Sequence, residues 1–114
     1  MKSHFIAGIL LATSAAIFMT AATAAEIDAD AAKKLAKRSG CFSCHAVDKP
    51  KIGPAYKKVA IKYKGKADGE EILIKFITTG PKAKTEDGTV LNHIIIDTKD
   101  QGELKNLVAW ILSQ

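Results

Sequence analysis

The five residues Cys41-Phe42-Ser43-Cys44-His45 carry the strongest functional signal in this chain of 114 residues. Two thiols at this spacing can form thioethers with the vinyl groups of a haem, while the imidazole that follows them reaches the iron. We therefore predict one covalently attached haem c, held by Cys41 and Cys44, with His45 bound to the iron. The other ring nitrogen of His45 needs a hydrogen-bond acceptor, and the carbonyl of Pro54 is the candidate.

A pair of cysteines at this spacing has other possible uses. It can be a redox-active dithiol, a disulfide or half of a zinc site. Zinc takes four ligands, and beyond residue 25 the chain has two cysteines and two histidines. Since His45 directly follows Cys44, it is poorly placed to share one zinc ion with that cysteine. A thioredoxin-like dithiol expects a strand-helix-strand context, which the sequence lacks.

The first 25 residues have the composition of a secretory signal peptide. A basic residue precedes an apolar run over residues 5–19, and small residues follow, so that cleavage fits before Ala25 or before Glu26. We predict a cleaved signal peptide over residues 1–25 and one domain over residues 26–114, located in the periplasm without a membrane span. An uncleaved anchor is the alternative, because the apolar run is only just short of the ~18 residues of a spanning helix.

Positive charge is concentrated around the Cys-x-x-Cys-His run. Without the signal peptide, 16 basic residues stand against 12 acidic ones, which gives a net charge of +4. Between Lys33 and Lys66, eleven lysine or arginine residues are opposed by one acid, Asp48. The interleaving of basic and aromatic residues that nucleic-acid binding favours is missing, so we expect no nucleic-acid partner. The basic block can instead steer redox partners with acidic docking faces toward the haem.

Helical signals dominate the chain after the signal peptide. A first helix capped by Asp28 or Asp30 is expected to run to about Arg38, with a small apolar stripe on one side. A second is expected over residues 55–64, where apolar residues recur at helical spacing. A third begins near Asp68 and ends at a Thr-Gly-Pro sequence that breaks helices.

The last helix has the clearest expected start. Thr98-x-x-Gln101 has the spacing of a capping box, in which a hydroxyl and an amide bind free backbone N–H groups. Residues 80–98 are expected to form a loop, and no strand pattern competes with the helices. The sequence therefore predicts an all-α domain of about four helices. A domain of about 90 residues has a marginal apolar core, which a buried haem would complete.

Three segments together resemble the short bacterial monohaem class I cytochromes c. They are Gly40-Cys41-Phe42-Ser43-Cys44-His45-Ala46, Ile52-Gly53-Pro54-Ala55-Tyr56-Lys57 and the C-terminal Ala109-Trp110-Ile111-Leu112-Ser113-Gln114. The resemblance implies the class I cytochrome c fold, with about four helices wrapped around one haem and the N- and C-terminal helices crossing. It also implies that Pro54 accepts a hydrogen bond from His45, and that Ile52 and Tyr56 lie against the haem.

The sequence departs from this family before the final helix. There the family has a methionine flanked by prolines, whereas this chain reads Gly88-Thr89-Val90-Leu91-Asn92-His93-Ile94-Ile95-Ile96. Its only methionines, Met1 and Met19, belong to the predicted signal peptide. We expect His93 to be the second iron ligand, because a neutral imidazole binds iron well. Asn92 is a weaker candidate, and an iron left open on that side is the main alternative.

These features predict an electron-transfer protein and not an enzyme. Bis-histidine ligation by His45 and His93 would lower the reduction potential below that of methionine-ligated relatives. We expect a monomer that exchanges electrons with redox partner proteins. The alternative function is a haem-based sensor or binding protein for CO, NO or O₂, in which His93 leaves the iron and admits the gas.

Overall fold

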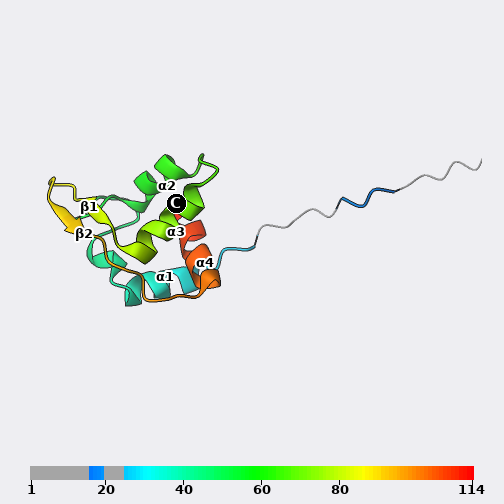
Figure 1. The fold of residues 1–114 in the computed structure, drawn as a ribbon, viewed down its shortest axis with the longest axis horizontal. Coiled ribbons are helices and arrows are strands. Elements are labelled where there is room, and N and C mark those ends of the chain that lie inside the picture. Colours follow the sequence, from blue (N-terminus) through cyan, green and yellow to red (C-terminus); the bar gives the residue numbers. More distant parts are fainter. Residues whose placement is uncertain (1–15, 20–24) are drawn as a thin grey trace, which may run out of the picture.

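Four α-helices and one short hairpin build the part of the chain that the computed structural model describes, residues 16–19 and 25–114 (Figure 1). The helices are α1 (Ala29–Arg38), α2 (Tyr56–Tyr63), α3 (Gly69–Thr79) and α4 (Gln101–Leu112), and the 3₁₀ turn η1 is Cys41–Ser43. The hairpin consists of β1 (Lys82–Lys84) and β2 (Val90–Asn92). This architecture confirms the predicted fold class of a small domain of about four helices, to which the structure adds the short hairpin.

The predicted signal peptide lies almost wholly outside the described residues, so its cleavage and the boundary at residue 25 stay predictions. Within the described ranges, no helix is both long enough and apolar enough to cross a bilayer.

The core forms where α4 packs against the other three helices. Its largest fully buried side chains are Leu35 of α1 and Leu104, Leu107 and Val108 of α4. They recur at helical spacing, which turns one apolar stripe of each helix inward. Each leucine so buried contributes roughly 1.5–3 kcal/mol relative to an exposed one. The contact between α1 and α4 joins the two ends of the domain, as the resemblance implies.

Hydrogen bonds between Asp28 and Asn106 join the start of α1 to α4. Asp28 caps the helix, because its side chain accepts a hydrogen bond from the N–H of Ala31 at 2.9 Å. The backbone of Asp28 binds the Asn106 amide twice: its N–H donates to Oδ1 and its carbonyl accepts from Nδ2, both at 2.8 Å. Of the two predicted caps, Asp28 is therefore the one used.

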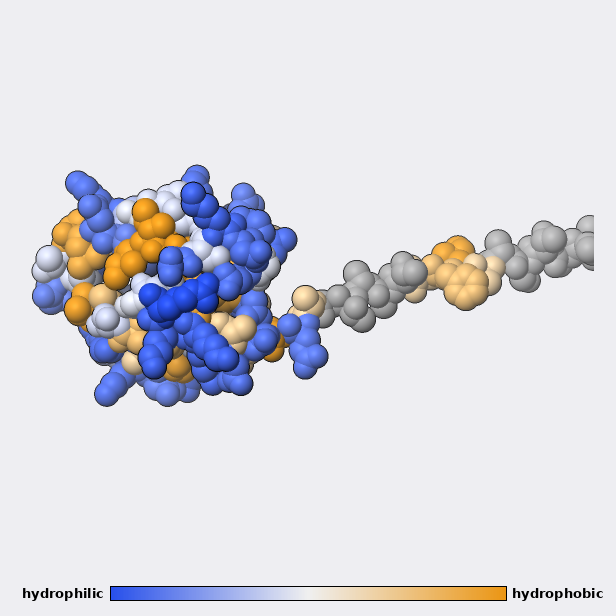
Figure 2. Space-filling model, turned by 90° about the horizontal axis from the view of Figure 1, so that it is seen from below, coloured by the Kyte–Doolittle hydropathy of each residue, from blue (hydrophilic) through white to orange (hydrophobic). Residues whose placement is uncertain are grey.

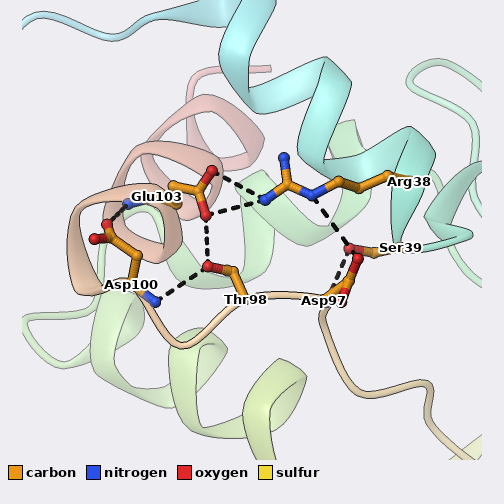
Figure 3. Close-up of polar contacts among 6 residues, drawn as sticks. All are labelled: Arg38, Ser39, Asp97, Thr98, Asp100 and Glu103. Carbon is orange, nitrogen blue, oxygen red and sulfur yellow. Dashed lines mark hydrogen bonds and ion pairs between the residues drawn. The ribbon is translucent and has the colours of Figure 1, made fainter.

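The predicted capping box at the start of α4 is wrong. The N-cap is Asp100, whose carboxylate accepts from the N–H of Glu103 at 2.8 Å. Thr98 lies two residues earlier, accepts from the N–H of Asp100 at 3.1 Å and donates its hydroxyl to the Glu103 carboxylate at 2.5 Å (Figure 3). Aspartate caps as well as threonine does, so the sequence held two competing start signals.

The same carboxylate joins α1 to α4. Arg38 Nη2 donates to the two Glu103 oxygens at 2.9 and 3.0 Å, while its Nε lies 3.9 Å from Asp97 (Figure 3). Ser39 accepts from the N–H of Asp97 at 3.0 Å. These contacts hold the end of α1 against the segment that leads into α4.

The segment between Gly80 and Thr98 is not simply the predicted loop. Its strands β1 and β2 pair antiparallel, with Ala83 opposite Leu91. In the turn, Asp87 accepts from the Thr85 hydroxyl and from the N–H of Thr89, at 2.5 and 3.0 Å. Both strands are three residues long and largely exposed. They therefore lack the alternation of buried and exposed residues by which a strand is predicted.

We expect Glu103→Gln to weaken the pH dependence of stability. Hydrogen bonds from Thr98 and Arg38 lower the pKa of Glu103 from its ordinary value of 4.5. A carboxyl whose pKa is lowered by folding stabilises the protein above its unfolded-state pKa, and this contribution is lost as the pH falls through the folded-state pKa. At pH 7, the variant should thus have a lower free energy of unfolding than the wild type. As the pH falls below about 5, the free energy of unfolding should decrease less in the variant than in the wild type.

Urea unfolding at a series of pH values measures this effect. Glu70→Gln is the matched control, since within the described ranges Glu70 makes no side-chain hydrogen bond or ion pair and lies on α3 away from Arg38. If the free energy of unfolding changed equally with pH in Glu103→Gln and the wild type, the contacts of Glu103 between α1 and α4 would contribute nothing to the pH dependence of stability.

Candidate functional site

The Cys-x-x-Cys-His run forms a tight turn directly after α1. Gly40 begins it with φ 79°, a left-handed conformation that favours glycine. The N–H groups of Cys44 and His45 then donate to the carbonyl of Cys41 at 3.1 and 2.9 Å. This turn brings both cysteines and His45 to the wall of one cavity. The two sulfurs are half-buried and form no disulfide.

The His45 ring is fixed on three sides. Its Nδ1 lies 2.7 Å from the carbonyl of Pro54, to which it donates, so the predicted hydrogen bond is present. The Tyr56 ring stacks on it, with 5.1 Å between centroids and 16° between planes. A Cβ on Gly53 would lie 2.7 Å from Cε1, so only glycine fits there without a shift. Donation from Nδ1 leaves Nε2 as the free nitrogen for a metal.

Burial favours the neutral forms of the groups around His45. It is the largest cause of the lowered pKa of His45, which the Pro54 carbonyl partly offsets. Burial likewise raises the pKa of the Cys41 thiol and of the Tyr56 phenol. Neutral imidazole is the form that binds iron, so the environment of His45 suits a ligand.

His93 lies on the opposite wall, directly after β2. Its N–H donates to the carbonyl of Pro81 at 2.8 Å, and its ring meets Phe76 edge to face at 4.9 Å between centroids. Its Nδ1 lies 2.8 Å from the carbonyl of Ile94. Gly80, with φ 60°, lets this segment approach α3, since a Cβ there would lie 2.6 Å from the His93 carbonyl oxygen.

The two histidines face one cavity of about 640 Å³. Their ring centroids are 6.1 Å apart and the ring planes are inclined by 49°. Two imidazoles on opposite sides of one metal, each with a metal–nitrogen bond of about 2 Å, would have centroids about 6 Å apart. Ile52 and Tyr56 line the same cavity, Ile52 at its exposed edge and Tyr56 buried. The residues predicted to bind the haem therefore line one space, whereas Asn92, the weaker candidate ligand, does not line it.

The wall formed by α2 and the hairpin carries positive charge, from Lys58, Lys62, Lys82 and Lys84. Glu86 is the acid among them, and it lies 3.7 Å from the Lys58 Nζ. The lysines of this wall would neutralise the carboxylates of a bound haem. Within the described ranges, no group of three or more cysteine, histidine or acidic side chains is arranged to hold a metal ion alone.

Comparison with known proteins agrees with this geometry. A family model described as Cytochrome c matches residues 29–114. The chain belongs to the cytochrome c family. As a cytochrome c, it has one haem c attached through Cys41 and Cys44, and it transfers electrons between redox partners. The ligand-binding alternative is not favoured by these relatives.

Three relatives illustrate the match. Cytochrome c-551 of Pseudomonas aeruginosa is 36% identical over 80 residues, which cover 70% of this chain and 73% of that protein. Cytochrome c-552 of Nitrosomonas europaea is 33% identical over 103 residues, covering 90% and 93%. The crystal structure of the class 1 cytochrome MtoD from Sideroxydans lithotrophicus ES-1 has 55% identity and a TM-score of 0.73, covering 77% of this chain and 97% of that one. The class I fold is thus shown by sequence and structure together.

Three residues of this cytochrome c matter to the site without having been predicted for it. Gly53 makes room for the His45 ring, Phe76 supports His93, and Gly80 positions the segment that carries His93. Gly53 lies between Ile52 and Pro54, so the motif itself pointed to it. The contact of Phe76 with His93 joins residues that are distant in sequence, and no local pattern predicts it.

Proposed function

We propose that this cytochrome c is an exported, periplasmic electron carrier whose haem iron is ligated by His45 and His93. When bound, the haem supplies a one-electron couple between ferric and ferrous iron. The chain supplies the two ligands, a buried site and a charged exterior. The only methionines, Met1 and Met19, lie in the predicted signal peptide, so none remains to take the second axial position.

The spacing of the two histidine rings carries this proposal. At 6.1 Å between centroids, they are separated as two ligands of one iron would be. Each ring also has its Nδ1 within hydrogen-bond distance of a backbone carbonyl, Pro54 for His45 and Ile94 for His93, at 2.7 and 2.8 Å. With Nδ1 donating, Nε2 is the free nitrogen in both rings. These two hydrogen bonds also hold both rings in a fixed orientation.

A lower reduction potential than in methionine-ligated relatives follows from this ligand pair. Methionine ligation raises the potential of a cytochrome c, and imidazole is the stronger donor to ferric iron. Because backbone carbonyls support both His45 and His93, the two histidines would stay in place in either oxidation state of a bound haem. This suits a carrier that gains and loses an electron repeatedly.

The surroundings of the iron support transfer over catalysis. Peroxide chemistry would need an open iron side and a group that stabilises a leaving oxygen. The only arginine of the chain, Arg38, is bound to Glu103 at the junction of α1 and α4. His93 cannot both bind the iron and act as an acid–base catalyst. We therefore propose no enzymatic activity.

Electron paramagnetic resonance of the ferric protein tests the ligand assignment. We expect a low-spin signal of bis-histidine type, and ferrous protein that does not bind carbon monoxide. His93→Ala should lose the low-spin signal and bind carbon monoxide, because one side of the iron is then open. Asn92→Ala, at the exposed neighbouring position, should behave as the wild type. Carbon monoxide binding by wild type and variant alike would instead support an open iron.

A further inference from the structure

A second, shallower groove lies on the surface and shares no lining residue with the haem cavity. It has a volume of about 240 Å³ and is formed by α1, the Cys-x-x-Cys-His turn and α4. Its rim and floor are Lys33, Lys34, Lys37, Phe42, Val47 and Trp110. Figure 2 views the molecule from below, the side on which α1 lies in Figure 1, and shows a mainly hydrophilic face with apolar residues among the charged ones.

The rim of the groove carries positive charges that are not paired with acidic side chains in the described part of the chain. Lys33, Lys34 and Lys37 are exposed and, three and four residues apart, share one side of α1. In the described part of the chain, no acid lies within ion-pair distance of them, whereas Arg38, Lys57 and Lys58 all have acidic partners. Lys51 does not line the groove, but its ammonium donates to the carbonyl of the lining residue Phe42 at 2.6 Å. Like charges at this spacing repel, so an acidic partner would relieve the repulsion.

The floor of the groove is apolar. Its residues are Phe42, Val47 and the edge of Trp110, which is only 4% exposed. An apolar floor between ammonium groups fits a segment that has one apolar side chain flanked by carboxylates. Nucleic acid fits less well, because the floor offers little aromatic face on which bases could stack.

Aromatic contacts also connect the floor of the groove to His45, the proposed iron ligand. Trp110 meets Phe42 and Tyr56 edge to face, at 6.5 and 5.6 Å between centroids. Tyr56 in turn stacks on His45 at 5.1 Å. Phe42 itself lies between the two cysteines that attach the haem. A partner seated in the groove is therefore joined to the haem site by an unbroken series of aromatic contacts.

We propose that this groove docks an acidic segment of a redox partner protein, with one apolar side chain of that segment against Phe42 and Trp110. The proposal rests on the electron-transfer function and specifies the surface through which a partner docks. It differs from docking at the haem cavity, where the apolar lining residues Ile52 and Ile94 are exposed.

Nuclear magnetic resonance of the ¹⁵N-labelled, haem-loaded protein tests this docking, with a synthetic peptide of four glutamates around one leucine as the probe. Trp110 is the only tryptophan of the chain, so its indole N–H gives a unique signal. We expect shift changes at the indole and at the backbone of Lys34, Lys37, Phe42 and Val47. The double variant Lys34→Glu with Lys37→Glu should bind the peptide roughly tenfold more weakly at low ionic strength.

The control is Lys75→Glu, an equal charge change per residue at an exposed position of α3 that lines neither cavity. It should weaken binding less than about twofold. Replacing leucine by glutamine in the peptide should also weaken binding, if an apolar side chain enters the groove. Shift changes centred on Ile52 and Ile94, or equal losses in Lys75→Glu and the double variant, would overturn the proposal.

The same samples keep this proposal separate from the electron-transfer function. The paramagnetic spectrum and the reduction potential report the haem, and the double variant should retain both. Peptide binding at the groove together with an open, high-spin iron would refute the ligand assignment but not the docking site. A bis-histidine spectrum without binding at the groove would refute the docking site alone.

Discussion

Replacing His93 by methionine is expected to raise the reduction potential of the haem by roughly 0.1–0.2 V, a part of the ~0.8 V over which axial ligands set haem potentials. The thioether stabilises ferrous iron relative to ferric iron, whereas imidazole does the opposite. A potentiometric titration of the wild type and His93→Met measures the difference directly. In its visible absorption spectrum, the ferric His93→Met variant should also gain a band at the red end, which ligation of the iron by the methionine sulfur produces.

Asn92→Met is the matched control for this exchange. It places the same side chain one residue earlier, at an exposed position of β2 that does not line the haem cavity. Its potential should equal that of the wild type. A potential that does not change in His93→Met would show that residue 93 is not bound to the iron. A rise in Asn92→Met would show instead that the hairpin can move a different residue onto it.

Gly53→Ala is expected to displace the His45 ring and to lower the free energy of unfolding by about 1–3 kcal/mol, as overpacking of a fixed site does. The added Cβ would lie 2.7 Å from Cε1 and 3.1 Å from both ring nitrogens. The ring cannot simply turn away, because Pro54 holds Nδ1 and Tyr56 covers its face. The low-spin spectrum should change together with the stability, since the displaced ring is the proposed iron ligand.

Gly65→Ala provides the control for Gly53→Ala. No atom lies within 4 Å of a Cβ at Gly65, and its φ is not positive. This variant should be as stable as the wild type or gain about 0.5 kcal/mol through a less flexible unfolded chain. If Gly53→Ala kept both its stability and its spectrum, the contact between Gly53 and His45 would not restrict the ring.

The helices were predictable because each is defined by signals close together in sequence. Asp28 caps α1 three residues before the N–H that it binds, and Gly80 ends α3 with a positive φ. The predicted start of α4 was wrong because Thr98 and Asp100 are both good caps, and only the side-chain bond from Thr98 to Glu103 separates them. The hairpin was missed since its strands are short and bury little.

The site was predictable to the extent that its residues form a motif. The Cys-x-x-Cys-His run gave the haem attachment, and Pro54 followed from the need of His45 for an acceptor. His93 was reached by exclusion, because methionine is missing from its usual segment. The distance between the two histidines depends on how the hairpin packs on α3, through Gly80, Pro81 and Phe76. No local pattern encodes that packing, so the structure alone supplies it.

The hydrogen bonds between Asp28 and Asn106 determine at which point of the domain a segment before Asp28 is attached. They hold Asp28 against α4, and the chain before it departs on the side away from the hairpin (Figure 1). A protein immobilised through residues before Asp28 would therefore turn its hairpin and haem cavity toward the solution. In film voltammetry, an electrode bearing the protein in this orientation would leave the hairpin side open to the solution, while the end of the domain at which α1 starts would face the electrode.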